Sequence, residues 1–186
     1  MKIAIIGPQN TGKSTFLADL LKVYPEYVTP TETYRDLVIR KGLRINQETG
    51  DESQRAIRDF LYLQVKENKE PNIFFDRSVI DNYVYTALAY ERGTATKELM
   101  RETQDIMLDS FCYLDRLFFI PTAVSVVLHN DLLRDIDTKF IDQTNHRFIA
   151  TLLDVRHKNP IVIDVISGGR EERVKTAQSI LGAYSE

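Results

Sequence analysis

The chain has 186 residues, of which 43% are hydrophobic and 27% are charged, with 24 basic and 27 acidic side chains. This length and apolar content suit one domain with one buried core, and they exclude a disordered or fibrous chain. A net charge of -3 argues against a protein that coats nucleic acid nonspecifically. The single cysteine, Cys112, cannot form an intrachain disulfide, and its setting between two aromatic residues predicts packing in the core.

No segment is typical of targeting or of membrane insertion. The apolar start at 3–6 is too short for a signal sequence and runs directly into Gly7. The longest apolar stretch, 117–128, is interrupted by Pro121 and falls short of the roughly 20 residues that span a bilayer. We therefore expect a cytoplasmic protein with no membrane partner.

Short apolar runs alternate with longer helical patterns along the chain. The strand-like runs are rich in β-branched or aromatic residues and lie at 2–6, 73–75, 117–120 and 161–166, with a weaker one at 27–29. Helical patterns cover 13–23, 51–69, 78–92, 96–113, 139–157 and 170–184. Continuous apolarity predicts strands buried on both faces, and the alternation predicts one α/β domain over residues 1–186, with a parallel sheet covered by helices.

The most specific motif is Gly7-Pro8-Gln9-Asn10-Thr11-Gly12-Lys13-Ser14-Thr15, which fits the pattern G-x-x-x-x-G-K-[ST] of a phosphate-binding loop. It follows an apolar strand and opens a helix, so that backbone N–H groups and the helix dipole can attract phosphate. We expect Lys13 to be a catalytic residue on the β- and γ-phosphates, and Ser14 to bind Mg²⁺. The predicted nucleotide-binding residues are Gly7, Asn10, Thr11, Gly12, Lys13, Ser14 and Thr15.

A carboxylate and a guanidinium follow the strand-like run at 73–75. Ligands of a doubly wound sheet bind at the carboxyl ends of its strands, so we predict that Asp76 is a catalytic residue and a metal ligand. A simple turn-capping role is the alternative. Arg77 comes next, at a helix start, where it can clamp a phosphate or an acceptor, and we predict catalytic and substrate-binding roles for it.

Further candidates follow the weak strand at 27–29 and the strand-like run at 117–120. Glu32 can accept the proton of an acceptor hydroxyl or bind metal through water, and Arg35 can hold substrate; a helix N-terminal acid and a solvated helix residue are equally good interpretations. Arg134 can close over a triphosphate as a catalytic residue, or form surface ion pairs of little effect. Tyr83 is a candidate for stacking on an acceptor base, although core or rim packing is the commoner role.

Four motifs follow one another along the chain: Gly7–Thr15, the acid and arginine of Thr31–Arg35, Asp76-Arg77-Ser78, and Arg134-Asp135-Ile136-Asp137 before a helix. Together they resemble the small AAA-type P-loop nucleotide kinases, which include the ribosylnicotinamide kinase domain of the NadR type and many phage-encoded relatives. Asp76-Arg77-Ser78 is also similar to an element of deoxynucleoside and thymidylate kinases. The resemblance implies a P-loop NTPase fold of the nucleotide kinase kind: a three-layer sandwich with about five parallel strands. It also implies a kinase that uses ATP and Mg²⁺ to phosphorylate a small nucleoside or nucleotide acceptor.

Two other functions remain open. Some phage relatives phosphorylate a 5-hydroxymethylated pyrimidine within DNA, and the segment 35–44, with four basic residues against one acid, can hold backbone phosphates or form an ordinary solvated helix face. A nucleotide-dependent switch without an acceptor is disfavoured, because Asp76-Arg77-Ser78 has no evident purpose there. The sequence also has no Asn-Lys-x-Asp motif for reading guanine.

Overall fold

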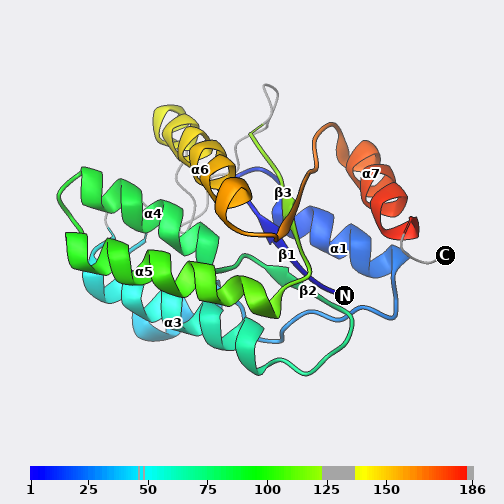
Figure 1. The fold of residues 1–186 in the computed structure, drawn as a ribbon, viewed down its shortest axis with the longest axis horizontal. Coiled ribbons are helices and arrows are strands. Elements are labelled where there is room, and N and C mark those ends of the chain that lie inside the picture. The colour runs from blue at the N-terminus through cyan, green and yellow to red at the C-terminus, as the bar shows by residue number, and fades with distance from the viewer. Residues whose placement is uncertain (46, 48, 123–136, 184–186) are drawn as a thin grey trace.

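The computed structural model describes residues 1–45, 47, 49–122 and 137–183 (Figure 1). At its centre lies a four-stranded sheet in the order β2-β1-β3-β4, in which all neighbouring strands are parallel. The strands are β1 (Lys2–Ile6), β2 (Ile73–Asp76), β3 (Arg116–Phe119) and β4 (Val162–Val165). The carboxyl ends of all four strands therefore meet at one edge of the sheet.

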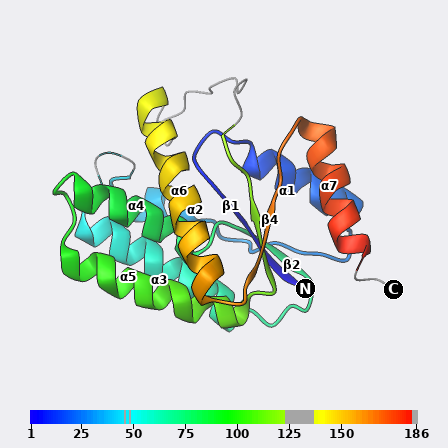
Figure 2. The ribbon, with the colours of Figure 1, turned by 45° about the horizontal axis from the view of Figure 1, so that its top comes forward.

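Helices cover both faces of this sheet, as Figures 1 and 2 show. One layer holds α1 (Lys13–Val23) and α7 (Arg170–Gly182). The other holds α2 (Tyr34–Lys41), α3 (Asp51–Glu67), α4 (Val79–Glu91), α5 (Lys97–Ser110) with the short 3₁₀ helix η2 (Phe111–Tyr113), and α6 (Thr138–Lys158). The predicted three-layer α/β sandwich is confirmed.

The central strand shows why its sequence is apolar throughout. Ile3 and Ile5 of β1 pack in the cluster beneath α1 and α7, whereas Ala4 and Ile6 pack in the cluster beneath the larger helical layer. All four side chains are fully buried. Because successive side chains of a strand point to opposite faces, a strand covered on both faces needs apolar residues at every position.

The weak strand predicted at 27–29 is reduced to a single bridge between Val28 and Ile73. The backbone N–H of Val28 donates to Asn72 O at 3.1 Å, and Phe74 N–H donates to Val28 O at 2.9 Å. Pro30 has no N–H group, so it cannot extend this pairing. In the described part of the chain the sheet therefore has four strands, where the resemblance implied about five.

Two predictions of burial are wrong. Val162 and Val165 are 42% and 57% exposed, because β4 is an edge strand and has a neighbour on one side only. Cys112 is exposed; its Sγ donates to Asp109 O at 3.0 Å, while the preceding Phe111 takes the buried position.

Helix α2 was not among the predicted helices. Thr33 caps it by accepting from Asp36 N–H, and Gly42 ends it in the left-handed conformation, with a φ of +61°. Over the residues that the structure describes, every helix is too short or too polar to cross a membrane.

Candidate active site

The phosphate-binding loop joins β1 to α1 and is held tightly against β3. Gly7 has a φ of +138°, and a Cβ atom at this position would lie 2.3 Å from the carbonyl oxygen of Ile120. Gly12 precedes α1 with a φ of +83°, and Asn10 also has a positive φ, of 61°. The clash at Gly7 is with backbone, which cannot rotate away, so this position requires glycine.

Lys13, at the start of α1, is buried, with 6% of its surface exposed. Its Nζ donates to the carbonyl oxygen of Gly7 at 2.7 Å and also to that of Pro8. Burial, followed by the nearby charge of Arg77, lowers the pKa of Lys13 to about 7. An anion beside this ammonium would raise the pKa again, so the electrostatics of the loop favour a bound phosphate.

Ser14 and Asp76 come together from positions 62 residues apart. The hydroxyl of Ser14, in the first turn of α1, donates to Asp76 Oδ2 at 3.2 Å across the end of β2. A hydroxyl and a carboxylate are the hard oxygen donors that Mg²⁺ prefers. The residues present therefore fit the magnesium ion that the sequence implies.

Arg77 is buried and its backbone is in an unusual conformation, with a φ of +83° for a residue that is not glycine. Its guanidinium carbon lies 4.6 Å from the ring centre of Tyr34 and 5.8 Å from that of Tyr85. Nη1 donates to Asp81 Oδ1 at 3.3 Å. Burial acts to lower the pKa of Arg77, but the two tyrosines and the carboxylate outweigh it and raise the pKa. Arg77 therefore stays charged. A buried charge on a strained backbone is typical of a functional site.

A pocket opens beside Arg77, between α2, α3 and α4, and has about 400 Å³ of space including solvent at its mouth. Its lining is Tyr34, Ile45, Gln54, Ile57, Leu61, Arg77, Asp81, Asn82 and Tyr85. The pocket thus combines apolar side chains with aromatic rings, two amides, one cation and one carboxylate.

The two amides of the pocket hold each other in place. Asn82 Nδ2 donates to Gln54 Oε1 at 2.7 Å and to the Gln54 carbonyl at 3.1 Å, and Thr86 Oγ1 donates to Gln54 Oε1 at 3.0 Å. These bonds fix which way the Asn82 amide is turned. Its Oδ1 is buried without a hydrogen-bond partner. A buried acceptor of this kind suits a ligand that brings an N–H or O–H group.

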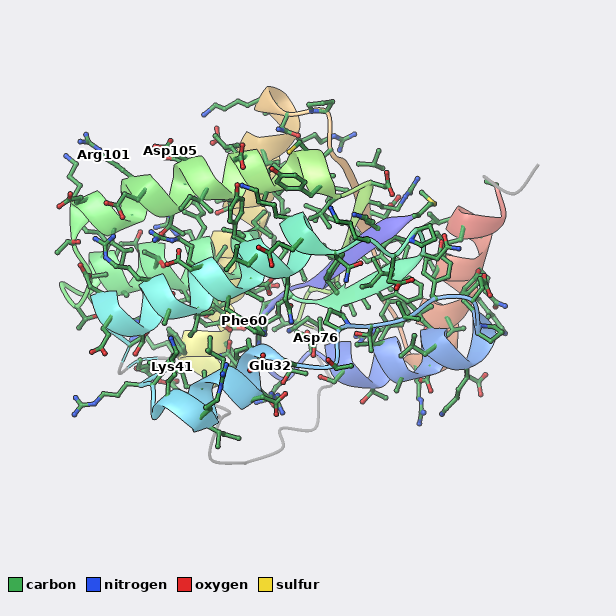
Figure 3. The ribbon with its side chains drawn as sticks, turned by 90° about the horizontal axis from the view of Figure 1, so that it is seen from below. Glu32, Lys41, Phe60, Asp76, Arg101 and Asp105 are labelled. Atoms are coloured by element: carbon green, nitrogen blue, oxygen red, sulfur yellow. The ribbon has the colours of Figure 1, made fainter. Side chains whose placement is uncertain are left out.

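The predicted residues Arg35, Glu32 and Arg134 differ in how the structure places them relative to the phosphate loop. The half-buried Arg35 lies close enough to Lys13 for its charge to lower the pKa of that lysine. Glu32 is paired with Arg40 of α2 at 2.5 Å, and in the view of Figure 3 it lies between Asp76 and α2. Arg134, the predicted clamp on the triphosphate, lies outside the described residues.

Tyr83 does not line the pocket, whereas Tyr85 does. Successive helix residues are rotated by about 100°, so Tyr85 shares a face with Asp81 and Tyr83 points to the other side. Burial raises the pKa of Tyr83, and the nearest charges acting on it belong to α6, beginning with Arg147. Helical spacing in the sequence separates the two tyrosines: Tyr85 lies four positions after Asp81 and so shares its helix face, whereas Tyr83 does not.

Asp81 and Arg173 are site residues that no motif in the sequence predicts. Asp81 Oδ2 accepts from Ser78 N–H at 3.1 Å, and the spacing Ser78-x-x-Asp81 is typical of a helix start. Arg173 of α7 donates from Nη1 to Thr11 O at 2.6 Å and from Nε to Gly168 O at 2.9 Å. No sequence signal connects an arginine near the end of the chain with the phosphate loop.

The comparisons with known proteins agree with this geometry. The sequence matches the family described as AAA domain over residues 2–173, and no curated protein matches it. The solved structure of a deoxyadenosine kinase from M. mycoides is similar, with a TM-score of 0.73 and 18% identity, over 98% of this chain and 100% of that one. A NadR protein in complex with NR has a TM-score of 0.71 and 15% identity, over 97% of this chain and 51% of that one.

Thymidylate kinase from Candida albicans is also similar, with a TM-score of 0.67 and 16% identity, over 99% of this chain and 92% of the other. At these identities the likeness establishes the fold. It is the P-loop kinase fold that the sequence motifs imply.

Proposed function

Because the chain belongs to the AAA domain family, we propose that it is a kinase that uses ATP and Mg²⁺ to phosphorylate a nucleoside or nucleotide. One observation carries the proposal. The phosphate-binding loop, the Ser14–Asp76 pair and a pocket containing a buried Arg77 adjoin one another at a single edge of the sheet. A donor site next to an acceptor site is the arrangement that phosphoryl transfer requires.

On the donor side, the positive charge of the site is suited to a triphosphate. Lys13, Arg35 and Arg77 lie close enough for the two arginines to lower the pKa of Lys13. In our proposal Lys13 exchanges its bonds to the loop carbonyls for bonds to phosphate oxygens, and the N–H groups of the loop hold the remaining oxygens.

Ser14 and Asp76 would hold the magnesium ion. When bound, the ion neutralises negative charge on the phosphates. Asp76 also orients the Ser14 hydroxyl through their 3.2 Å hydrogen bond, so the carboxylate keeps the hydroxyl turned toward the site.

On the acceptor side, the pocket is suited to a flat molecule with polar edges. Tyr34 and Tyr85 offer aromatic surface, and Asn82 Oδ1 offers a buried hydrogen-bond acceptor. Arg77 orients the acceptor next to the donor phosphates. Glu32 is our candidate for the base that accepts the proton of the attacking hydroxyl, and Arg134 for a clamp on the donor.

The similar structures support an acceptor of the nucleoside or nucleotide class, since two of them are named as deoxyadenosine kinase and thymidylate kinase. The described residues do not favour DNA as the acceptor: Arg40, one of the basic residues of α2, is paired with Glu32. A switch without an acceptor would leave the pocket beside Arg77 without a purpose.

The test is a transfer assay with radiolabelled ATP over nucleosides, their monophosphates, ribosylnicotinamide and hydroxymethylated DNA. We expect label to appear on at least one small acceptor, only when Mg²⁺ is present. Label on DNA alone would favour the DNA kinase. Hydrolysis of ATP with no labelled acceptor would contradict the kinase proposal and favour a switch.

A further inference from the structure

Asp81 is a buried carboxylate that touches both halves of the site. It is 1% exposed. Its Oδ1 accepts from Gly7 N–H at 3.2 Å, in the donor loop, and from Arg77 Nη1 at 3.3 Å, in the acceptor pocket. One oxygen atom therefore joins two segments that are 70 positions apart in the sequence.

The second oxygen fixes the carboxylate to α4. Oδ2 accepts from the backbone N–H of Ser78 at 3.1 Å, at the start of the helix. The same helix carries Asn82 and Tyr85, which line the pocket. Asp81 therefore connects Gly7 of the phosphate loop with the first turn of α4 as well as with Arg77.

Two cations near Asp81 stabilise its buried negative charge. Burial acts to raise the pKa of Asp81, and Arg77 and then Lys13 act against it. A buried carboxylate is stable only while its cationic and N–H partners remain in place. Displacement of Arg77 from Asp81 therefore costs free energy, and it disturbs the hydrogen bond that Gly7 N–H donates to the same oxygen.

Resting on the proposed function, we propose that Asp81 is a positioning residue that couples the donor loop to the acceptor pocket. Occupation of the loop by the donor adjusts Gly7 and, through Asp81, sets the guanidinium of Arg77 and the pocket face of α4. Coupling of this kind is reciprocal, so a change at Arg77 must also be felt at Gly7.

The first experiment titrates the protein with Mg-ADP and follows the NMR signals of the Asn82 side-chain amide and of the Arg77 guanidinium. In the parent protein both signals shift as Mg-ADP binds. In Asp81→Asn, Mg-ADP still binds, and the two shifts fall by about fivefold or more. Asp51→Asn is the matched control, because Asp51 joins two helices through Thr96 N–H at 2.9 Å and Thr96 Oγ1 at 2.6 Å and does not line the pocket. The control keeps both shifts.

The second experiment needs no nucleotide and no change at Asp81. Arg77→Met fills the space between the tyrosines but removes the charge that holds Asp81. We expect hydrogen exchange at the Gly7 amide to become about tenfold faster, whereas Arg55→Met, which breaks the ion pair with Glu102 between α3 and α5, leaves it unchanged.

The outcomes separate the two proposals. If Mg-ADP does not bind the parent protein, the proposed function fails, and the exchange of Gly7 in Arg77→Met still decides whether the coupling exists. If Mg-ADP binds but both shifts persist in Asp81→Asn, or if the exchange of Gly7 is unchanged in Arg77→Met, the coupling role of Asp81 is overturned.

Discussion

Arg77 is the residue at which the two sides of the site meet. It follows Asp76 on a backbone with positive φ, it lies over two tyrosine rings, and it donates to Asp81. Few side chains in the described structure combine burial, charge and backbone strain in this way. Each of these features destabilises the fold, so their combination favours a role in binding a ligand.

We expect Arg77→Ala to damage acceptor handling more than donor handling. Loss of a charged hydrogen bond should lower kcat/KM for the acceptor by about 1.5–3 kcal/mol, while affinity for an ATP analogue changes less. Arg77→Lys should restore little if the contact is a two-pronged one, because an ammonium is a point charge. Steady-state kinetics beside calorimetry measures both. Loss of analogue binding with intact acceptor affinity would make Arg77 a donor clamp instead.

Lys13→Met should remove phosphoryl transfer and leave the fold, as judged by circular dichroism. Methionine fills the buried space of Lys13 but brings no charge to the donor phosphates. Transfer at the parent rate by this variant would contradict the assignment of the phosphate loop.

Lys13 also predicts a pH dependence of stability. Its folded pKa of about 7 lies below the ordinary 10.5, so between these values the unfolded chain binds more protons. The free energy of unfolding of the ligand-free protein should therefore gain a rising contribution between pH 7 and 10.5, which Lys13→Met lacks. Denaturant unfolding across this range measures the difference. Parallel curves for the two proteins would contradict it.

At the scale of elements, a hydrogen bond between Ser14 and Asp76 joins the start of α1 to the end of β2. Because both side chains offer hard oxygen ligands to a metal ion, we expect EDTA to abolish phosphoryl transfer and Mg²⁺ to restore it. Asp76→Asn should need a higher Mg²⁺ concentration for half-maximal activity. Full activity in a thoroughly chelated sample would exclude the metal role of both residues.

Helix α7 makes two different contacts with the donor side. Arg173 donates to Thr11 O from a buried position, whereas Arg170 forms a surface pair with Asp19 at 2.6 Å. We expect Arg173→Met to weaken binding of an ATP analogue by about 1–3 kcal/mol, since the loop loses its brace. Arg170→Met, the matched control, should change it by less than about 1 kcal/mol. Calorimetric titration distinguishes them, and equal effects would refute a specific role for Arg173.

At the scale of the whole molecule, nucleotide binding should stabilise the fold. The donor site is assembled from β1, α1, β2 and α7, so a ligand that bridges them opposes global unfolding. Mg-ADP at a hundredfold excess over its Kd should add about 2.7 kcal/mol and raise Tm. Lys13→Met should show a much smaller rise. An unchanged Tm in the parent protein would contradict a donor site in the loop.

The sequence was sufficient for the layers and for the position of the phosphate loop, and insufficient for the pocket beside Arg77. Apolar runs and the loop motif are local signals, so β1, α1 and the approach of Ser14 to Asp76 could be predicted. The pocket depends on which faces of α3 and α4 meet, and this is decided by packing. Gln54 and Asn82 are ordinary helix residues until the two helices are placed side by side.

The single bridge at Val28 has a consequence for the order in which the molecule loosens. The segment that leads to Glu32 and to the pocket wall at Tyr34 is tied to the sheet by two backbone hydrogen bonds, and α2 adds the buried Leu37 and Val38. Detaching the segment from Val28 to the end of α2 disturbs fewer contacts than breaking the four-stranded sheet. In the proposed reaction, the outer wall of the pocket is therefore the route by which an acceptor enters and a product leaves, while the phosphate loop keeps its own contacts with the sheet.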